Sequence, residues 1–140
     1  MTVADVMRHD VVTVSPETPV NEVATTMRDE DVGSVVVVED DEPVGLVTDR
    51  DVAVRIAADG LDAAEMTAER MMTEDPVTVE ADTGLFELST RLCDEAVRRM
   101  PVVDADGDLA GIVTLDDLAV LLVGELGNLA GVIDAESPAY

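Results

Sequence analysis

Hydrophobic and polar positions follow the same succession of periods in both halves of the chain. In the first half, a short apolar run at 11–14 precedes apolar positions at helical spacing, which are Val20, Val23, Ala24 and Met27. The continuous apolar run at 35–38 is typical of a strand buried on both faces, and the turn EDDEP joins it to a second strand, VGLVT. A further helix is predicted to begin after Thr48 and to run to about Ala58.

Residues that favour helix ends set the expected limits of these helices. Ser15 is a suitable N-cap for the first helix, and Gly33 is expected to end it. The corresponding helices of the second half are predicted over 83–96 and from about Asp116 onward.

The second half repeats the first in register. VMRHDVVTV aligns with MMTEDPVTV, and GSVVVVEDDEPVGLVTDRDVA aligns with RRMPVVDADGDLAGIVTLDDLA, with one extra residue in the second hairpin loop. Both copies predict the order β-α-β-β-α, so the fold class is α+β (α/β-like), with tandem repeats about a pseudo-two-fold axis. We expect a first repeat over 1–60, a linker over 61–66, a second repeat over 67–123 and a C-terminal helical extension over 124–140. This extension could cover its own core or a second chain.

The chain is strongly acidic. It has a net charge of −24, and its eight basic residues are all arginines, which makes non-specific nucleic-acid binding unfavourable. The acidic residues are spread along a chain that is 47% hydrophobic, which indicates folding rather than disorder. Abundant Asp without Lys is typical of proteins from halophiles, and we expect the fold to loosen when salt is removed. Because no apolar run approaches the length needed to span a membrane and the N-terminus does not resemble a signal peptide, we expect a cytoplasmic protein without a membrane segment.

Motifs for chemistry are missing from the sequence. Cys93 is the only cysteine and is predicted to be a buried, inert thiol, and His9 is the only histidine, predicted in a surface loop. The acidic turn DADGD at 104–108 has its glycine at the fourth position rather than the sixth, as a calcium loop requires, so it is predicted to be a hairpin turn. We therefore expect no metal site and no enzymatic activity.

Two matching motifs, GLVTDRD at 45–51 and GIVTLDD at 111–117, join a strand to a helix in each repeat. Thr followed three residues later by Asp is the spacing of a capping box, and capping alone would explain both motifs. Together with the TV openings, the strand MPVVD and the order of elements, however, the duplicated motifs resemble a pair of cystathionine β-synthase (CBS) domains, the Bateman module. The resemblance covers roughly residues 1–123.

This resemblance implies a regulatory module that binds an adenosine-containing ligand, namely AMP, ADP, ATP or S-adenosylmethionine, in two clefts between the repeats. It also implies a homodimer formed through helices and a signal passed to a separate protein effector. The ligand is regulatory, and no catalytic cofactor is expected. The alternative is a dimeric interaction scaffold whose clefts bind no ligand.

The resemblance implies that the Asp of each motif binds the ribose hydroxyls and that the Thr lies near phosphate. A carboxylate accepts two adjacent hydroxyl protons, and a helix N-terminus suits a phosphate. The clefts are crossed, so the adenine at each corner contacts the first strand of the other repeat. The full set of candidate ligand-binding residues is Val11, Val12, Gly33, Ser34, Thr48, Asp51, Pro76, Val77, Arg98, Arg99, Pro101, Thr114, Asp116 and Asp117.

The two clefts differ in charge. Arg98 and Arg99 precede the MPVVD strand and would bind phosphate, whereas the matching positions of the first repeat are Gly33 and Ser34. The same arginines could instead be surface residues paired with Asp94 or Glu95. Ser34 could equally serve only as a small residue in a tight turn.

Overall fold

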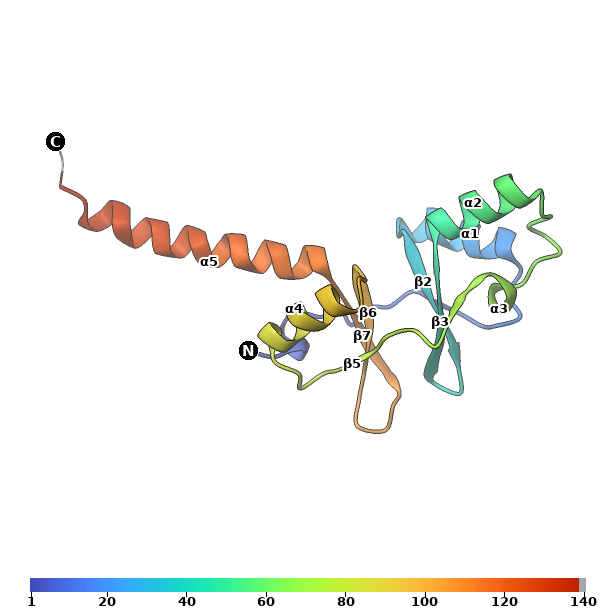
Figure 1. Ribbon diagram of the computed structural model, residues 1–140, viewed down its shortest axis with the longest axis horizontal. Helices are drawn as coiled ribbons and strands as arrows, with labels where there is room; N and C mark the ends of the chain where they lie inside the picture. Colours follow the sequence, from blue (N-terminus) through green and yellow to red (C-terminus); the bar gives the residue numbers. More distant parts are fainter. Residues whose placement is uncertain (139–140) are drawn as a thin grey trace.

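The computed structural model describes residues 1–138, and within them the strands form two separate sheets (Figure 1). The first unit contains β1 (Thr13–Val14), α1 (Val20–Glu30), β2 (Ser34–Glu39), β3 (Glu42–Thr48) and α2 (Asp49–Asp59). The second contains β5 (Val79–Glu80), α4 (Leu85–Asp94), β6 (Arg99–Val103), β7 (Leu109–Thr114) and α5 (Leu115–Glu136). The short element η1 (Val3–Asp5) precedes the first unit along the chain, and α3 (Ala68–Met71) and β4 (Thr73–Glu74) lie between α2 and β5.

The second sheet has three strands, and three of the four strands of the first sheet share its topology, which confirms the predicted fold class and the β-α-β-β-α order. The fourth strand of the first sheet is β4, which pairs antiparallel with β3. In each sheet, the first short strand pairs in parallel with the first hairpin strand, and the hairpin strands pair antiparallel. Ser34 lies opposite Thr48 in one hairpin, and Arg99 lies opposite Thr114 in the other. The structure thus places Ser34 and Arg99 at equivalent positions, as the sequence alignment indicated.

Each hydrophobic core is completed by a short segment of the other repeat. In both cases this segment comes just before that other repeat's first strand. Val3 of η1 is fully buried in the core of the second unit, whereas Ala68 and Met71 of α3 are fully buried in the core of the first. Backbone hydrogen bonds hold both segments. The amide of Val3 donates to the carbonyl of Thr83 at 2.8 Å, and that of Ala68 donates to Thr18 at 2.8 Å. The chain therefore crosses between the units twice.

These crossings explain the glycine at the start of each of the two motifs, GLVTDRD and GIVTLDD. A Cβ at Gly111 would lie 2.8 Å from the backbone oxygen of Arg8 and 2.8 Å from Sδ of Met7, and a Cβ at Gly45 would overlap the side chain of Met72. Contacts this short are not tolerated, so each glycine makes room for the crossing segment that packs on its strand.

Two helix boundaries differ from the sequence expectation. The first helix begins after Pro19, not at Ser15, because a residue that precedes proline, here Thr18, is disfavoured in helical conformation. It ends at Asp31, which adopts the left-handed conformation with φ of 53°, so Gly33 lies beyond the helix.

The prediction that Cys93 is buried is also wrong, because this thiol on α4 is exposed to solvent.

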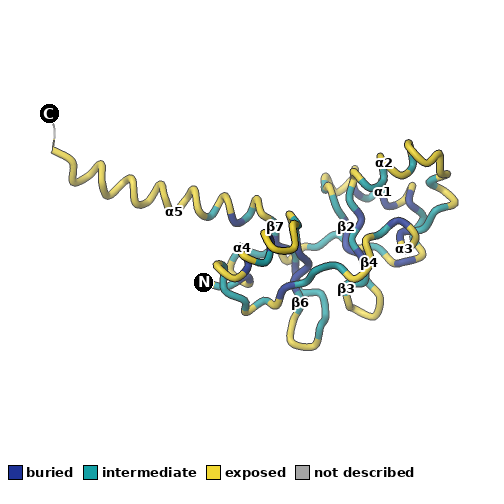
Figure 2. The backbone as a smooth tube through the Cα atoms, viewed as in Figure 1, coloured by how far each residue is buried: buried dark blue, intermediate teal, exposed yellow. Residues whose placement is uncertain are grey.

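The C-terminal helix is longer than expected. Instead of a helix followed by a separate short extension, α5 runs without a break for 22 residues and projects away from both units (Figures 1 and 2). The expected tail at 124–140 is part of this helix as far as Glu136, and residues 139 and 140 lie outside the described part. Its length and a mean hydropathy of 1.7 over 18 residues would also allow it to cross a membrane, a possibility that the sequence expectation excluded.

Candidate ligand-binding clefts

Both predicted Thr–Asp corners are complete capping boxes. In α2 the amide of Asp51 donates to the Thr48 hydroxyl at 3.1 Å, and the amide of Thr48 donates to the Asp51 carboxylate at 3.0 Å. In α5 the same two bonds join Thr114 and Asp117 at 3.1 and 3.0 Å. The capping role is therefore present in both repeats without any ligand.

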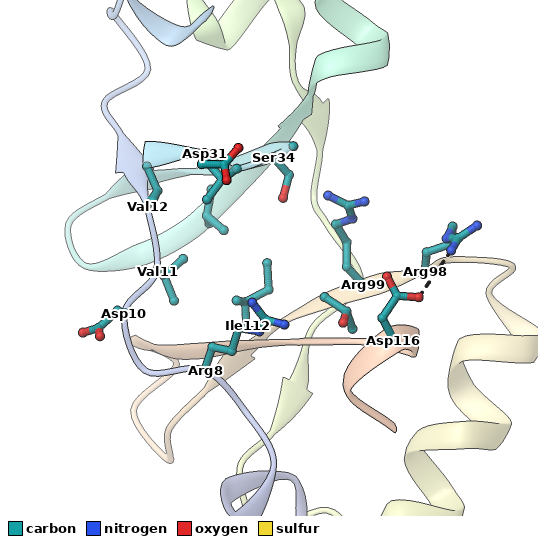
Figure 3. Close-up of a pocket in the computed structure, with 14 residues that line it drawn as sticks. Arg8, Asp10, Val11, Val12, Asp31, Ser34, Arg98, Arg99, Ile112 and Asp116 are labelled. Carbon is teal, nitrogen blue, oxygen red and sulfur yellow. Dashed lines mark hydrogen bonds and ion pairs between the residues drawn. The ribbon is translucent and has the colours of Figure 1, made fainter. Parts of the chain in front are cut away.

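The larger of the two cavities next to these corners lies between the repeats and has a volume of about 310 Å³ (Figure 3). One wall comes from the loop before β1 and from the turn and strand after α1, and the other comes from β6, β7 and the start of α5. The lining residues are Arg8, Asp10, Val11, Val12, Asp31, Val32, Gly33, Ser34, Val36, Arg98, Arg99, Ile112, Thr114 and Asp116.

This cavity is rich in arginine for so acidic a protein, although Asp10, Asp31 and Asp116 also line it and balance the three positive charges. Arg8, Arg98 and Arg99 line it, and they are three of only eight basic residues in the chain. Arg98 forms an exposed ion pair with Asp116 at 3.5 Å, not with Asp94 or Glu95. Within residues 1–138, Arg99 makes no ion pair, so its guanidinium is available to an anionic group.

A smaller cavity of about 190 Å³ also borders β6. Its lining residues are Leu46, Thr73, Asp75, Pro76, Val77, Val97, Arg99, Pro101. The structure thus brings Pro76 and Val77 together with Pro101, and Arg99 contributes to both cavities. Ligand pockets usually have volumes of about 300–1,000 Å³, so of these two cavities the one between the repeats reaches that range.

Three predicted residues line neither cavity. Thr48 and Asp51 lie at the start of α2, outside the walls of the smaller cavity. Asp117 lies in the first turn of α5, next in sequence to Asp116, which lines the larger cavity. Asp117 is instead paired with Arg8, whose Nη2 lies 2.8 Å and whose Nε lies 3.0 Å from the Oδ1 atom of Asp117.

The pairing with Arg8 changes the electrostatics of the Asp117 corner. Partial burial alone would raise the pKa of the Asp117 carboxyl, but hydrogen bonds from Thr114 and Arg8 outweigh burial and hold that pKa below its usual value. The hydrogen bond to Asp117 raises the pKa of Arg8 in turn. Asp117 is therefore ionised at neutral pH.

Sequence reasoning missed Arg8, Asp10, Asp31 and Ile112 as cavity residues. The repeat alignment places Arg8 opposite Thr73, and the structure places each of them in the lining of a cavity, but neither position carried a signal in the sequence. Asp31 could not be predicted either, because its position depends on where α1 ends.

Comparisons with known proteins identify the repeats. The family model of the CBS domain matches residues 3–58 and again residues 68–124. The chain is 40% identical to the CBS domain-containing protein YhcV of Bacillus subtilis, with 84% of this chain and 83% of that protein covered. It is also 40% identical to an uncharacterised protein of Methanopyrus kandleri, with 84% of this chain covered but only 61% of that relative. The inosine-5'-monophosphate dehydrogenase of Thermoplasma acidophilum is 31% identical over 78% of this chain, which covers only 21% of the enzyme.

Solved structures share the fold. CBSX2 of Arabidopsis thaliana in complex with AMP has a TM-score of 0.75 at 28% identity, with 88% of this chain and 96% of that chain covered. A CBS domain pair in complex with 5'-methylthioadenosine and S-adenosyl-L-methionine has a TM-score of 0.79 with 89% and 98% covered, and at 23% identity this likeness concerns the fold alone.

Proposed function

The chain belongs to the CBS domain family as a tandem pair of CBS repeats, and we propose on this basis that it is a regulatory module that binds an adenosine-containing ligand between its repeats. Ligand binding would favour one arrangement of the repeats over another and so signal to a separate protein. A catalytic role is not part of this proposal, since the enzyme among the relatives above is covered only over about a fifth of its length.

One observation carries the proposal, namely that residues from both repeats converge on one cavity of ligand size. Val11 and Val12 offer apolar contact for a base, Thr114 offers a hydroxyl at a helix N-terminus, and Arg98 and Arg99 offer positive charge. A volume of about 310 Å³ lies at the lower end of the range for ligand pockets, which favours a small ligand. We therefore propose AMP or a ligand of similar size, with the larger cavity as the principal site.

Replacing Asp117 by asparagine should weaken AMP binding. Hydrogen bonds to a charged group contribute about 1.5–3 kcal/mol, so removal of the charge should raise the Kd about 10- to 100-fold. Isothermal titration calorimetry in molar KCl with adenosine, AMP, ATP and S-adenosylmethionine measures the effect.

The matched control is Asp5→Asn. Asp5 closes a third capping box with Thr2 but lies outside both cavities, so this variant should bind like the unaltered protein. An equal loss of affinity in both variants would show that Asp117 acts only through its helix cap. Absence of binding by the unaltered protein to any of the four ligands would refute the proposed function and favour an interaction scaffold.

We also propose that α5 pairs with α5 of a second copy. Leu122, Leu126, Leu129 and Ile133 lie at alternating spacings of four and three residues and are all exposed, as in the seam of a coiled coil. The helix also contains three glycines with nothing within 4 Å of a Cβ, and each glycine costs about 1 kcal/mol in a helix interior. Such a helix gains stability only when its seam is covered.

A bilayer is the less suitable occupant of this surface. Glu125 lies near the middle of the helix, and a carboxylate there is costly in hydrocarbon. The helix has no arginine at either end to contact lipid headgroups, and acidic residues occupy its first turn.

Leu129→Glu should therefore convert a dimer into a monomer, because it places a charge in the seam of both chains. Asn128→Glu adds the same charge on the opposite side of α5 and should leave the dimer intact. Sedimentation equilibrium in molar KCl measures the mass. A monomeric unaltered protein, or equal dissociation of both variants, would contradict the proposal. Flotation with phosphatidylcholine vesicles that is lost in Leu129→Glu would identify a membrane as the partner instead.

A further inference from the structure

The carboxylate of Asp117 has no acceptor position left for a ligand. Its Oδ1 atom accepts from Nε and Nη2 of Arg8 at 3.0 and 2.8 Å. Its Oδ2 atom accepts from the amide and the hydroxyl of Thr114 at 3.0 and 2.7 Å. An ionised carboxylate has about four lone-pair sites, and all of them are used here. A vicinal diol can therefore bind to Asp117 only if one of these donors leaves.

Arg8 is the donor that can leave. The two bonds from Thr114 belong to the helix cap, and the Asp117 side chain they hold is only 12% exposed. The side chain of Arg8 is 68% exposed, so rotation into solvent removes few packing contacts. The backbone of Arg8 is fixed, because its amide donates to Ile112 at 2.9 Å and its carbonyl accepts from Ile112 at 3.0 Å. A released guanidinium thus stays at the rim of the same cavity (Figure 3).

The other repeat has no such contact. Thr73 occupies the position equivalent to Arg8, and the Asp51 carboxylate accepts only the capping bond from Thr48 among the described residues. The pairing is therefore a property of one corner and is not part of the capping motif that both corners share.

We propose that Arg8 is a latch that competes with the ligand for Asp117 and selects for phosphorylated ligands. This inference rests on the proposed function, that is, on binding of a nucleoside-containing ligand in the larger cavity. Every ligand with a ribose must displace the guanidinium from Asp117. A ligand with a phosphate offers the displaced guanidinium a new anionic partner, whereas a nucleoside offers none. The latch thus penalises adenosine more than AMP.

The experiment compares Arg8→Gln with Arg28→Gln. Arg28 is likewise exposed and paired with a carboxylate, that of Asp29 at 2.9 Å, but it lines neither cavity. Both variants lose one positive charge, so they share any general electrostatic effect. Calorimetric titrations with adenosine and with AMP in molar KCl give the four affinities, and thermal melts verify that both variants fold.

Arg8→Gln should bind adenosine about two- to five-fold more tightly than the unaltered protein, the range set by one exposed ion pair. Its preference for AMP over adenosine should fall, and Arg28→Gln should change neither quantity. Arg8→Lys keeps the charge but not the two-pronged contact, and it should give an intermediate adenosine affinity.

Unchanged or weaker adenosine binding by Arg8→Gln, beside an unaltered protein that binds AMP, would overturn the latch but leave the proposed function intact. Binding of adenosine by Arg8→Gln alone would support the latch in its strongest form. If neither the unaltered protein nor Arg8→Gln bound adenosine or AMP, the proposed function would be refuted, and the latch with it.

Discussion

Replacing Met71 by alanine should lower the free energy of unfolding by about 2–5 kcal/mol, the range for truncation of a fully buried large side chain. Met71 belongs to α3, the first segment of the second repeat in sequence, but it is fully buried in the core of the first unit. The variant therefore tests whether the crossing segment contributes to the stability of the unit it enters. Urea denaturation at a fixed molar KCl concentration measures the change.

Phe86→Ala is the matched control, because Phe86 is 92% exposed at the start of α4. Exposed substitutions of this kind change stability by about 0.5 kcal/mol or less. If Met71→Ala were as mild as Phe86→Ala, α3 would not be packed as the structure describes.

Lowering the salt concentration should produce the second large effect, a fall of many degrees in the melting temperature. The chain has a net charge of −24, and its described residues form only three ion pairs, which cannot offset the repulsion among carboxylates. The Debye length is about 30 Å at 0.01 M salt but about 3 Å at 1 M, so molar KCl removes most of this repulsion. Thermal melts between 0.01 and 3 M KCl, with no ligand present, measure the dependence. An unchanged cooperative melt at the lowest salt would contradict it.

Repulsion among carboxylates can also be tested at one place in the fold, the tips of the two hairpins. The amide of Leu109 donates to the carbonyl of Asp41 at 2.8 Å, so the acidic turns of both repeats lie together. Desolvation and the nearby charges of Asp104 and Asp41 raise the pKa of Asp108. A carboxyl with a raised pKa in the folded state opposes folding once it is ionised, above that pKa. Asp108→Asn should therefore raise the melting temperature at neutral pH in low salt, and the gain should shrink in molar KCl.

The sequence contained enough to predict the order of elements, because apolar runs and helical spacing recur in both repeats. The crossing segments could not be predicted from the sequence, because η1 and α3 are too short to show a hydrophobic period. The start of α1 was misplaced because Ser15 is a good cap in isolation, while Pro19 restricts the residue before it. The continuity of α5 was missed because Gly124 and Gly127 favour an interruption when only local propensity is considered.

The sequence predicted those residues of the candidate site that occupy matching positions in the two repeats. It did not predict contacts that depend on the direction of a side chain. Alignment placed Ser34 opposite Arg99 and so located the wall that carries positive charge. Only the structure could show that Arg8 reaches Asp117, since 109 positions separate them in the sequence. Likewise, Thr48 and Asp51 match the motif as well as their counterparts but lie outside the smaller cavity.

The two crossings of the chain mean that neither repeat is a self-contained cassette. A fragment cut between α2 and α3 would keep η1, whose partner core is then missing, and would lose α3, which fills its own core. A repeat transplanted into another protein must therefore carry the first segment of its neighbour with it. For the same reason, a single-repeat chain of this design could close its core only by exchanging that segment with a second copy, so the tandem arrangement joins in one chain what would otherwise require two.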